Sequence, residues 1–177
     1  WWSDTVSTGV GESGADGLFW DQTHGANWMR PRSQMNQIQP SHVKLLKVTK
    51  EKLGEDSFLL VNNAADISSY VSNCDGVMYE HYGMDKRYKK NRHLFVKDWD
   101  QMLEVANMGK INIYRMTPLS FVPHDQSPVN EALLAKKNQY SQYADDYTRK
   151  LIPFPLASFL MGVQPYSYFM YGRGWGL

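Results

Sequence analysis

The chain has 177 residues, which is enough for one domain with a hydrophobic core. Its 19 lysines and arginines nearly balance its 18 acids, so the net charge of +1 argues against nucleic acid or a membrane surface as a partner. A single cysteine, Cys74, excludes an intrachain disulfide, and no run of 18 or more apolar residues predicts a membrane-spanning helix.

Five short apolar runs stand out along the chain, at residues 15–21, 58–63, 74–81, 111–116 and 166–171. Most of these runs lack strict alternation of apolar and polar residues, which is typical of strands buried on both faces in a parallel sheet. The segments between them are mostly helical in pattern. The sequence therefore predicts an α/β fold in which strands and helices alternate.

Helices are predicted over residues 1–7, 40–54, 96–108, 129–150 and 154–163, whereas residues 22–39 are expected to be irregular. Gly54 and Gly109 serve as the expected stop signals of the second and third helices. The glycines of residues 9–14 match the dinucleotide fingerprint GxGxxG, but a helix precedes them and a strand follows, which inverts the required order. We therefore predict a glycine-rich turn there and expect no cofactor.

A closed (β/α)8 TIM barrel needs eight strands and typically about 250 residues. Five predicted strands would correspond to strands four to eight of such a barrel, so the chain is expected to be a fragment that three strand–helix units precede. An open, doubly wound sheet of five strands is the alternative fold. In either case residues 1–177 are expected to form a single domain.

The predicted strands share polar residues at their carboxyl ends, where α/β enzymes place their active sites. Two segments, 16–21 and 75–80, follow one pattern: Asp-Gly, three hydrophobic or aromatic residues, and an acid. We expect Asp16 and Asp75 to form turns before the strands. We expect Asp21 and Glu80 to converge on one cleft, because both follow the carboxyl ends of strands. A pair of carboxylates is what glycoside hydrolysis requires.

The segments 16–25, 62–65, 75–82 and 164–169, taken in this order, resemble the bacterial TIM-barrel glycoside hydrolases of a poorly characterised group. The resemblance spans nearly the whole chain. It implies a carboxylate on barrel strand four as nucleophile or base, and one on strand six as acid, at the positions of Asp21 and Glu80. It also implies hydrolysis of O-glycosidic bonds in a poly- or oligosaccharide substrate.

Further side chains are expected to bind the sugar, because they follow the strands and offer amide, cationic or aromatic groups. Arg115 has two interpretations, since it would either bind an anionic sugar or pair with one of the two acids. The expected substrate-binding residues are His24, Trp28, Asn62, Asn63, His81, Arg115, Tyr171 and Trp175.

Two other functions remain open at this point. Asp21, His24, Glu80 and His81 would suit a metal-assisted hydrolase, although their spacing is not diagnostic. A carbohydrate-binding or degenerate barrel that no longer cleaves its ligand is the non-enzymatic alternative. Carboxylates on opposite faces, or more than roughly 12 Å apart, would exclude the glycosidase hypothesis.

Overall fold

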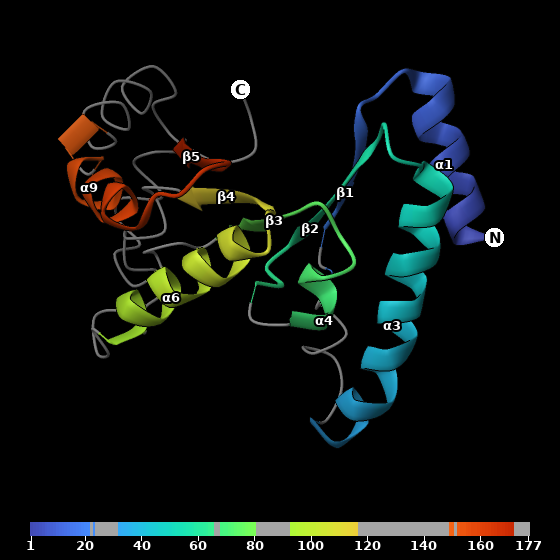
Figure 1. Cartoon of the computed structure of the whole chain (residues 1–177), viewed down its shortest axis with the longest axis horizontal. Helices are drawn as coiled ribbons and strands as arrows, with labels where there is room; N and C mark the ends of the chain where they lie inside the picture. The colour runs from blue at the N-terminus through green and yellow to red at the C-terminus, as the bar shows by residue number, and fades with distance from the viewer. Residues whose placement is uncertain are drawn as a thin grey trace, which may run out of the picture.

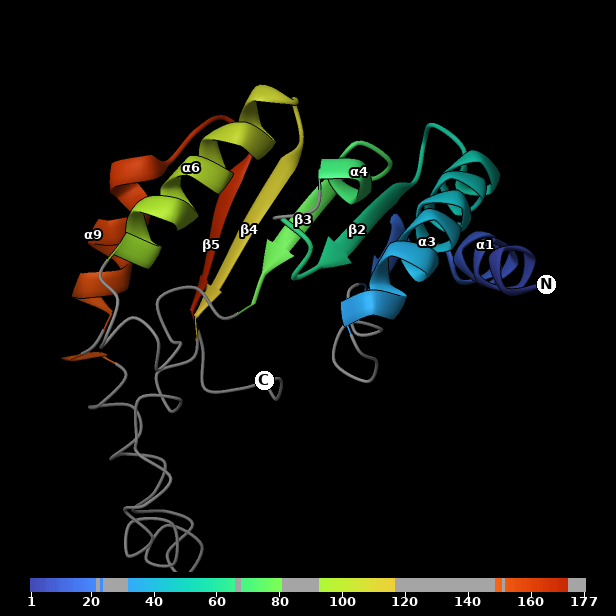
Figure 2. The ribbon, with the colours of Figure 1, turned by 90° about the horizontal axis from the view of Figure 1, so that it is seen from below.

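A computed structural model describes residues 1–21, 23, 32–65, 68–80, 93–116, 149–150 and 152–171. These residues form one five-stranded parallel sheet with helices against one of its faces (Figures 1 and 2). The elements in chain order are α1 (Trp2–Ser13), β1 (Gly17–Trp20), α3 (Arg32–Leu53), β2 (Phe58–Asn62), α4 (Ser68–Val71), β3 (Gly76–Tyr79), α6 (His93–Asn107), β4 (Ile111–Met116), α9 (Pro153–Gly162) and β5 (Ser167–Tyr171).

The strands lie side by side in chain order, β1-β2-β3-β4-β5, and every neighbouring pair is parallel. A doubly wound sheet reverses its strand order at a switch point, and this sheet has no reversal. The predicted α/β fold and all five strands are confirmed, and the doubly wound alternative is wrong. The topology is compatible with part of a TIM barrel, although the strands that the structure describes form an open sheet.

Two hydrophobic clusters attach the helices to one face of the sheet. Around Leu46 of α3, the first cluster joins Leu59 and Val61 of β2 to Val77 of β3. The second cluster is smaller and joins α6, β4 and α9 through Met102, Tyr114 and Phe159. Because side chains alternate along a strand, the residues between these positions face the other side of the sheet.

The face without helices carries exposed apolar side chains in the described part of the chain. They are Phe19, Phe58, Tyr168 and Met170, which are 40 to 55% exposed. The residues that end β2 and β4 on this same face are polar, namely Asn62 and Arg115. The open face is therefore apolar along the strands and polar at their carboxyl ends.

The two Asp-Gly pairs begin their strands for the same steric reason. A Cβ at Gly17 would collide with the backbone of Phe58, and one at Gly76 would collide with Ile111. The side chain of Asp75 joins the start of β3 to β2, because its Oδ2 accepts a hydrogen bond of 2.8 Å from the backbone N–H of Leu59. The turn role expected of Asp75 stays a prediction, because this bond reaches a neighbouring strand and not the turn itself.

Two helix predictions need correction. Gly9 and Gly11 lie inside α1 and not in a turn; the helix ends only at Gly14, whose φ of 69° is left-handed. In addition, α3 begins at Arg32 and continues through Pro40, a residue that usually ends a helix.

Tertiary contacts on both sides of Pro40 explain why α3 continues. The amide of Gln39 donates to Ser69 at 3.2 Å, and the ring of His42 is hydrogen-bonded to the hydroxyl of Tyr70 at 3.1 Å. Both partners belong to α4, so packing overrides the local preference. The helices predicted over 96–108 and 154–163 are confirmed within one to three residues, and the one predicted over 129–150 lies almost entirely outside the described residues.

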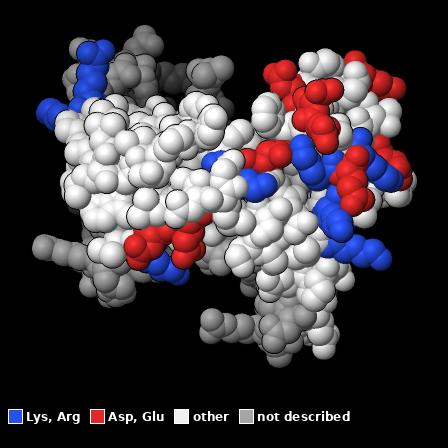
Figure 3. All heavy atoms as spheres, viewed as in Figure 1, with Lys and Arg blue, Asp and Glu red and all other residues white. Residues whose placement is uncertain are grey.

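Charges are mixed on the surface around α1 and α3, where Figure 3 shows positive and negative side chains interspersed. In the part of the chain that the structure describes, no helix combines the length and apolar character needed to span a membrane.

Candidate active site

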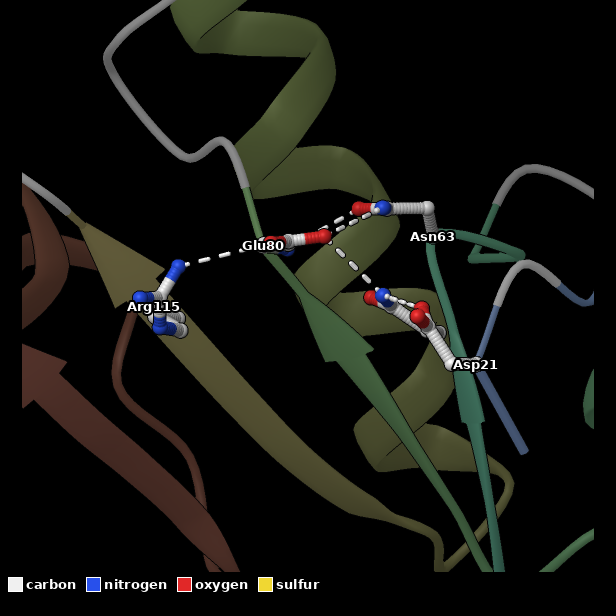
Figure 4. Close-up of polar contacts among 5 residues, drawn as sticks. Asp21, Asn63, Glu80 and Arg115 are labelled. Atoms are coloured by element: carbon white, nitrogen blue, oxygen red, sulfur yellow. Dashed lines mark hydrogen bonds and ion pairs between the residues drawn. The ribbon is translucent and has the colours of Figure 1, made fainter. Parts of the chain in front are cut away.

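Asp21 and Glu80 meet at the carboxyl end of the sheet through one amide of Asn62. The side-chain nitrogen of Asn62 donates to Oδ1 of Asp21 at 2.6 Å and to Oε2 of Glu80 at 3.0 Å. The two acceptor oxygens are therefore no farther apart than the sum of these distances, about 5.6 Å. Figure 4 shows the two carboxylates on one side of the sheet. Opposite faces or a distance above roughly 12 Å would have excluded a glycosidase, and the two acids meet neither criterion.

Glu80 is buried, with only 7% of its surface exposed, and it is surrounded by donors. Its Oε2 also accepts a hydrogen bond of 3.2 Å from the amide of Asn63, and its Oε1 lies 3.4 Å from a guanidinium nitrogen of Arg115. Hydrogen bonds to an ionised group are stronger than those between neutral groups. The contacts thus stabilise a negative charge on Glu80, while Asp21, the other acid, is exposed.

Arg115 faces Glu80 from the end of β4 and is itself buried. Burial lowers the pKa of Arg115, and the charge of the neighbouring Glu80 opposes this shift. Of the two expected roles, pairing with an acid is the one observed. The guanidinium remains charged at neutral pH, because arginine side chains keep their proton in proteins.

The backbone around the two asparagines bends so that both side chains reach Glu80. Asn62 is the last residue of β2 and fully buried, whereas Asn63 has a left-handed φ of 56°. Asparagine tolerates this conformation better than most residues. A regular strand would point the two side chains to opposite faces, so the bend at Asn63 is what brings both amides to one oxygen.

Thr23 also belongs to this site, and the sequence analysis missed it. Its hydroxyl donates to the carbonyl of Trp20 at 2.7 Å and accepts the backbone N–H of Asn62 at 3.3 Å. Thr23 thereby folds the chain back after β1 and holds it against the end of β2. The sequence offered one signal for this turn: Thr23 stands two residues after the strand-ending acid, and threonine hydroxyls often form turns.

The other predicted site residues divide into two groups. Tyr171 ends β5, but its ring stacks on Phe169 at 6.1 Å between centroids, and Phe169 packs against Phe159 of α9. Its ring therefore lies on the helical side of the sheet and does not join the carboxylates. His24, Trp28, His81 and Trp175 lie outside the described residues.

The four metal ligands considered from the sequence lie only partly within the described residues. Among the residues that it describes, no group of three or more histidine, cysteine, aspartate or glutamate side chains could hold a metal ion. Two of the four ligands considered above, His24 and His81, lie outside that part of the chain. The arrangement of Asp21, Glu80 and two amides is instead one of two acids with hydrogen-bond donors.

The fold and the site define an α/β protein with a polar cluster at the carboxyl edge of a parallel sheet, the edge at which such proteins bind ligands. The profile of hypothetical glycosyl hydrolase family 15 matches residues 1–176, and the chain belongs to this family. No curated protein matches the chain. The family name indicates a glycoside hydrolase and agrees with the resemblance found in the sequence.

Proposed function

We propose that the chain carries the carboxylate pair of a glycoside hydrolase acting on O-glycosidic bonds of an oligo- or polysaccharide, with Asp21 and Glu80 as the pair. One observation carries the proposal: a single amide nitrogen of Asn62 bonds both acids, which come from the ends of different strands. Glycoside hydrolysis needs two carboxyl groups on either side of the scissile bond. Membership of the hypothetical glycosyl hydrolase family supports the same chemistry.

The separation of the two carboxyl groups decides between a retaining and an inverting mechanism. Carboxyl groups lie about 5–5.5 Å apart in retaining enzymes and roughly 6.5–9.5 Å apart in inverting ones, where a water molecule must fit between acid and sugar. The bound of about 5.6 Å joins one oxygen of Asp21 to one oxygen of Glu80, and the carboxyl carbons can lie farther apart, so this geometry is compatible with both mechanisms. In the retaining sequence one carboxylate attacks the anomeric carbon, and the other protonates the leaving oxygen and then activates water.

The roles within the pair have two assignments. The resemblance makes Glu80 the acid and Asp21 the nucleophile. The reverse assignment is supported by the donors around Glu80, because Arg115 and the two asparagine amides stabilise the charge that a nucleophile needs. The exposed Asp21 would then be the proton donor.

The first experiment measures release of 4-nitrophenol from a panel of 4-nitrophenyl α- and β-glycosides. We expect Asp21→Asn and Glu80→Gln each to lower kcat by about 10²–10⁴-fold, because each removes a group that takes part in bond cleavage. Asp56→Asn is the matched control, since Asp56 is an exposed acid in the turn before β2. Wild-type turnover by either site variant would refute the assignment of the pair.

Glycosides with a better leaving group assign the two roles. With 2,4-dinitrophenyl glycosides the departing oxygen needs no proton, so the variant that lacks the acid keeps most of its first-step rate. The variant that lacks the nucleophile stays inactive on both substrates. The anomer of the first product, read by proton NMR, distinguishes retention from inversion.

The two alternatives give different results in the same assays. A carbohydrate-binding protein would bind oligosaccharides in calorimetry without turnover, and both the wild type and Glu80→Gln would be inactive. A metal-assisted hydrolase would lose activity on treatment with EDTA and regain it with a divalent metal ion. A carboxylate-pair glycosidase keeps its rate in EDTA.

A further inference from the structure

Asn63 replaces one backbone hydrogen bond between β2 and β3 with a hydrogen bond to its side chain. Its backbone N–H donates to the carbonyl of Met78 at 2.8 Å, which continues the parallel ladder by one rung. On the next rung of a parallel ladder, the N–H of Glu80 would bond to the backbone carbonyl of Asn63. It donates at 2.9 Å to the side-chain Oδ1 of Asn63 instead.

The left-handed backbone of Asn63 explains this exchange. At a φ of 56° the chain turns out of the sheet, and the side-chain carbonyl occupies the rung in place of the backbone carbonyl. The other end of the same amide, Nδ2, then lies 3.2 Å from Oε2 of Glu80. One side chain thus fixes both the backbone and the carboxylate of Glu80, as the close-up in Figure 4 shows.

We infer that Asn63 is a positioning residue for Glu80, an inference that rests on the proposed function of the carboxylate pair. One N–H and one lone pair of its amide are engaged by Glu80, so Asn63 can act on the reaction through this acid. Asn62 differs, because its one nitrogen holds Asp21 as well as Glu80. The substrate contact expected of Asn63 from the sequence stays a prediction beside this role, because its amide has a second N–H.

The orientation of the neighbouring amide strengthens the inference. In the part of the chain that the structure describes, the buried Oδ1 of Asn62 has no hydrogen-bond partner. A buried acceptor without a hydrogen bond is energetically unfavourable. The nitrogen of Asn62 is shared between both acids and donates only one bond to Glu80. The second bond to Oε2 and the bond to the backbone N–H of Glu80 both come from Asn63.

Two variants separate the side chain of Asn63 from its backbone conformation. Asn63→Gly keeps the left-handed φ without strain and removes both contacts with Glu80. Asn63→Asp keeps an acceptor for the N–H of Glu80 but places a second carboxylate beside Oε2. We expect Asn63→Gly to lower kcat on the 4-nitrophenyl glycosides by about 10²-fold with KM within about twofold, because a misplaced catalytic group slows the reaction without weakening binding.

The pH profile of Asn63→Asp gives a signature that a merely structural role would not produce. At neutral pH the two neighbouring carboxylates repel, and the loss of kcat is at least as large as in Asn63→Gly. At acidic pH the introduced carboxyl holds a proton and offers the same donor and acceptor as the amide. The activity of Asn63→Asp relative to wild type therefore rises as the pH falls, whereas the ratio for Asn63→Gly stays low.

Hydrogen exchange tests the two contacts of Asn63 with Glu80 in the absence of any substrate. In NMR exchange, the backbone amide of Glu80 loses protection in Asn63→Gly and keeps it in Asn63→Asp, while the amide of Val61 in the middle of β2 stays protected in both. A wild-type kcat or unchanged protection of the Glu80 amide in Asn63→Gly overturns the inference. If Glu80→Gln itself retains activity, the proposed function fails, and the exchange measurement still decides whether Asn63 fixes Glu80.

Discussion

Acids at the amino edge of the parallel sheet, where the strands begin, have different partners from acids at its carboxyl edge, where the strands end. At the amino edge, Oδ2 of Asp75 accepts the N–H of Leu59 at 2.8 Å and lies 2.8 Å from Nζ of Lys50. At the carboxyl edge, Asp21 and Glu80 share one amide nitrogen of Asn62. The acid at the amino edge is neutralised by a lysine and tied to a neighbouring strand. The acids at the carboxyl edge are brought toward each other.

This difference separates stability from chemistry along the length of the strands. Asp75, which is paired with a lysine and bonded to the neighbouring strand, stabilises the fold. Two acids held close together repel each other, so they lower stability unless donors compensate for them. In α/β barrels the amino edge serves stability and the carboxyl edge carries the active site. Variants at the two edges should therefore differ in what they change.

The largest effect on stability is expected from Arg115→Met at the carboxyl edge. Removing the cation leaves Glu80 buried without its guanidinium partner, and breaking a buried pair in this way costs about 3–5 kcal/mol. Urea unfolding measures the change. In a Glu80→Gln background the same substitution should cost clearly less, and an equal loss in both backgrounds would show that the two side chains do not interact.

A smaller loss, confined to stability, is expected from Gly76→Ala at the amino edge. The new Cβ would press on Ile111 and Leu60, and such overpacking costs about 1–3 kcal/mol. The matched control is Gly11→Ala in α1, where a Cβ meets nothing and helix propensity predicts a gain of about 1 kcal/mol. A Gly76→Ala protein that unfolds like wild type would contradict the tight packing of β3 on β4.

The smallest effect concerns Cys74, just before β3. Burial raises the pKa of the Cys74 thiol from 9.0 to about 12, so the folded protein keeps it neutral at pH 8. We expect no alkylation by iodoacetamide at pH 8 before unfolding in urea, and full alkylation afterwards, as measured by mass spectrometry. The associated stability is present below pH 9 and is lost as the pH rises toward 12. Equal alkylation rates before and after unfolding would contradict this burial.

The outcome of the sequence predictions follows the range of the interactions involved. The segment 111–116 was predicted with its observed bounds, since a short apolar run is a local property. The course of α3 through Pro40 was not, because its contacts with α4 come from residues about 30 positions away. The local signal at Thr23 indicated only a turn, and its contact with Asn62 was missed because that partner is 39 residues further along.

The sequence by itself determined the parallel α/β class, the five strands and the two acids that follow the first and third of them. Such features follow from hydrophobic pattern and from the residues at strand ends. Only the tertiary structure decided that Asn62 bridges the two acids, that Arg115 pairs with Glu80, and that Tyr171 turns away. These contacts depend on strand register and on one left-handed residue, Asn63, and no local pattern encodes which side chains such a bend brings together.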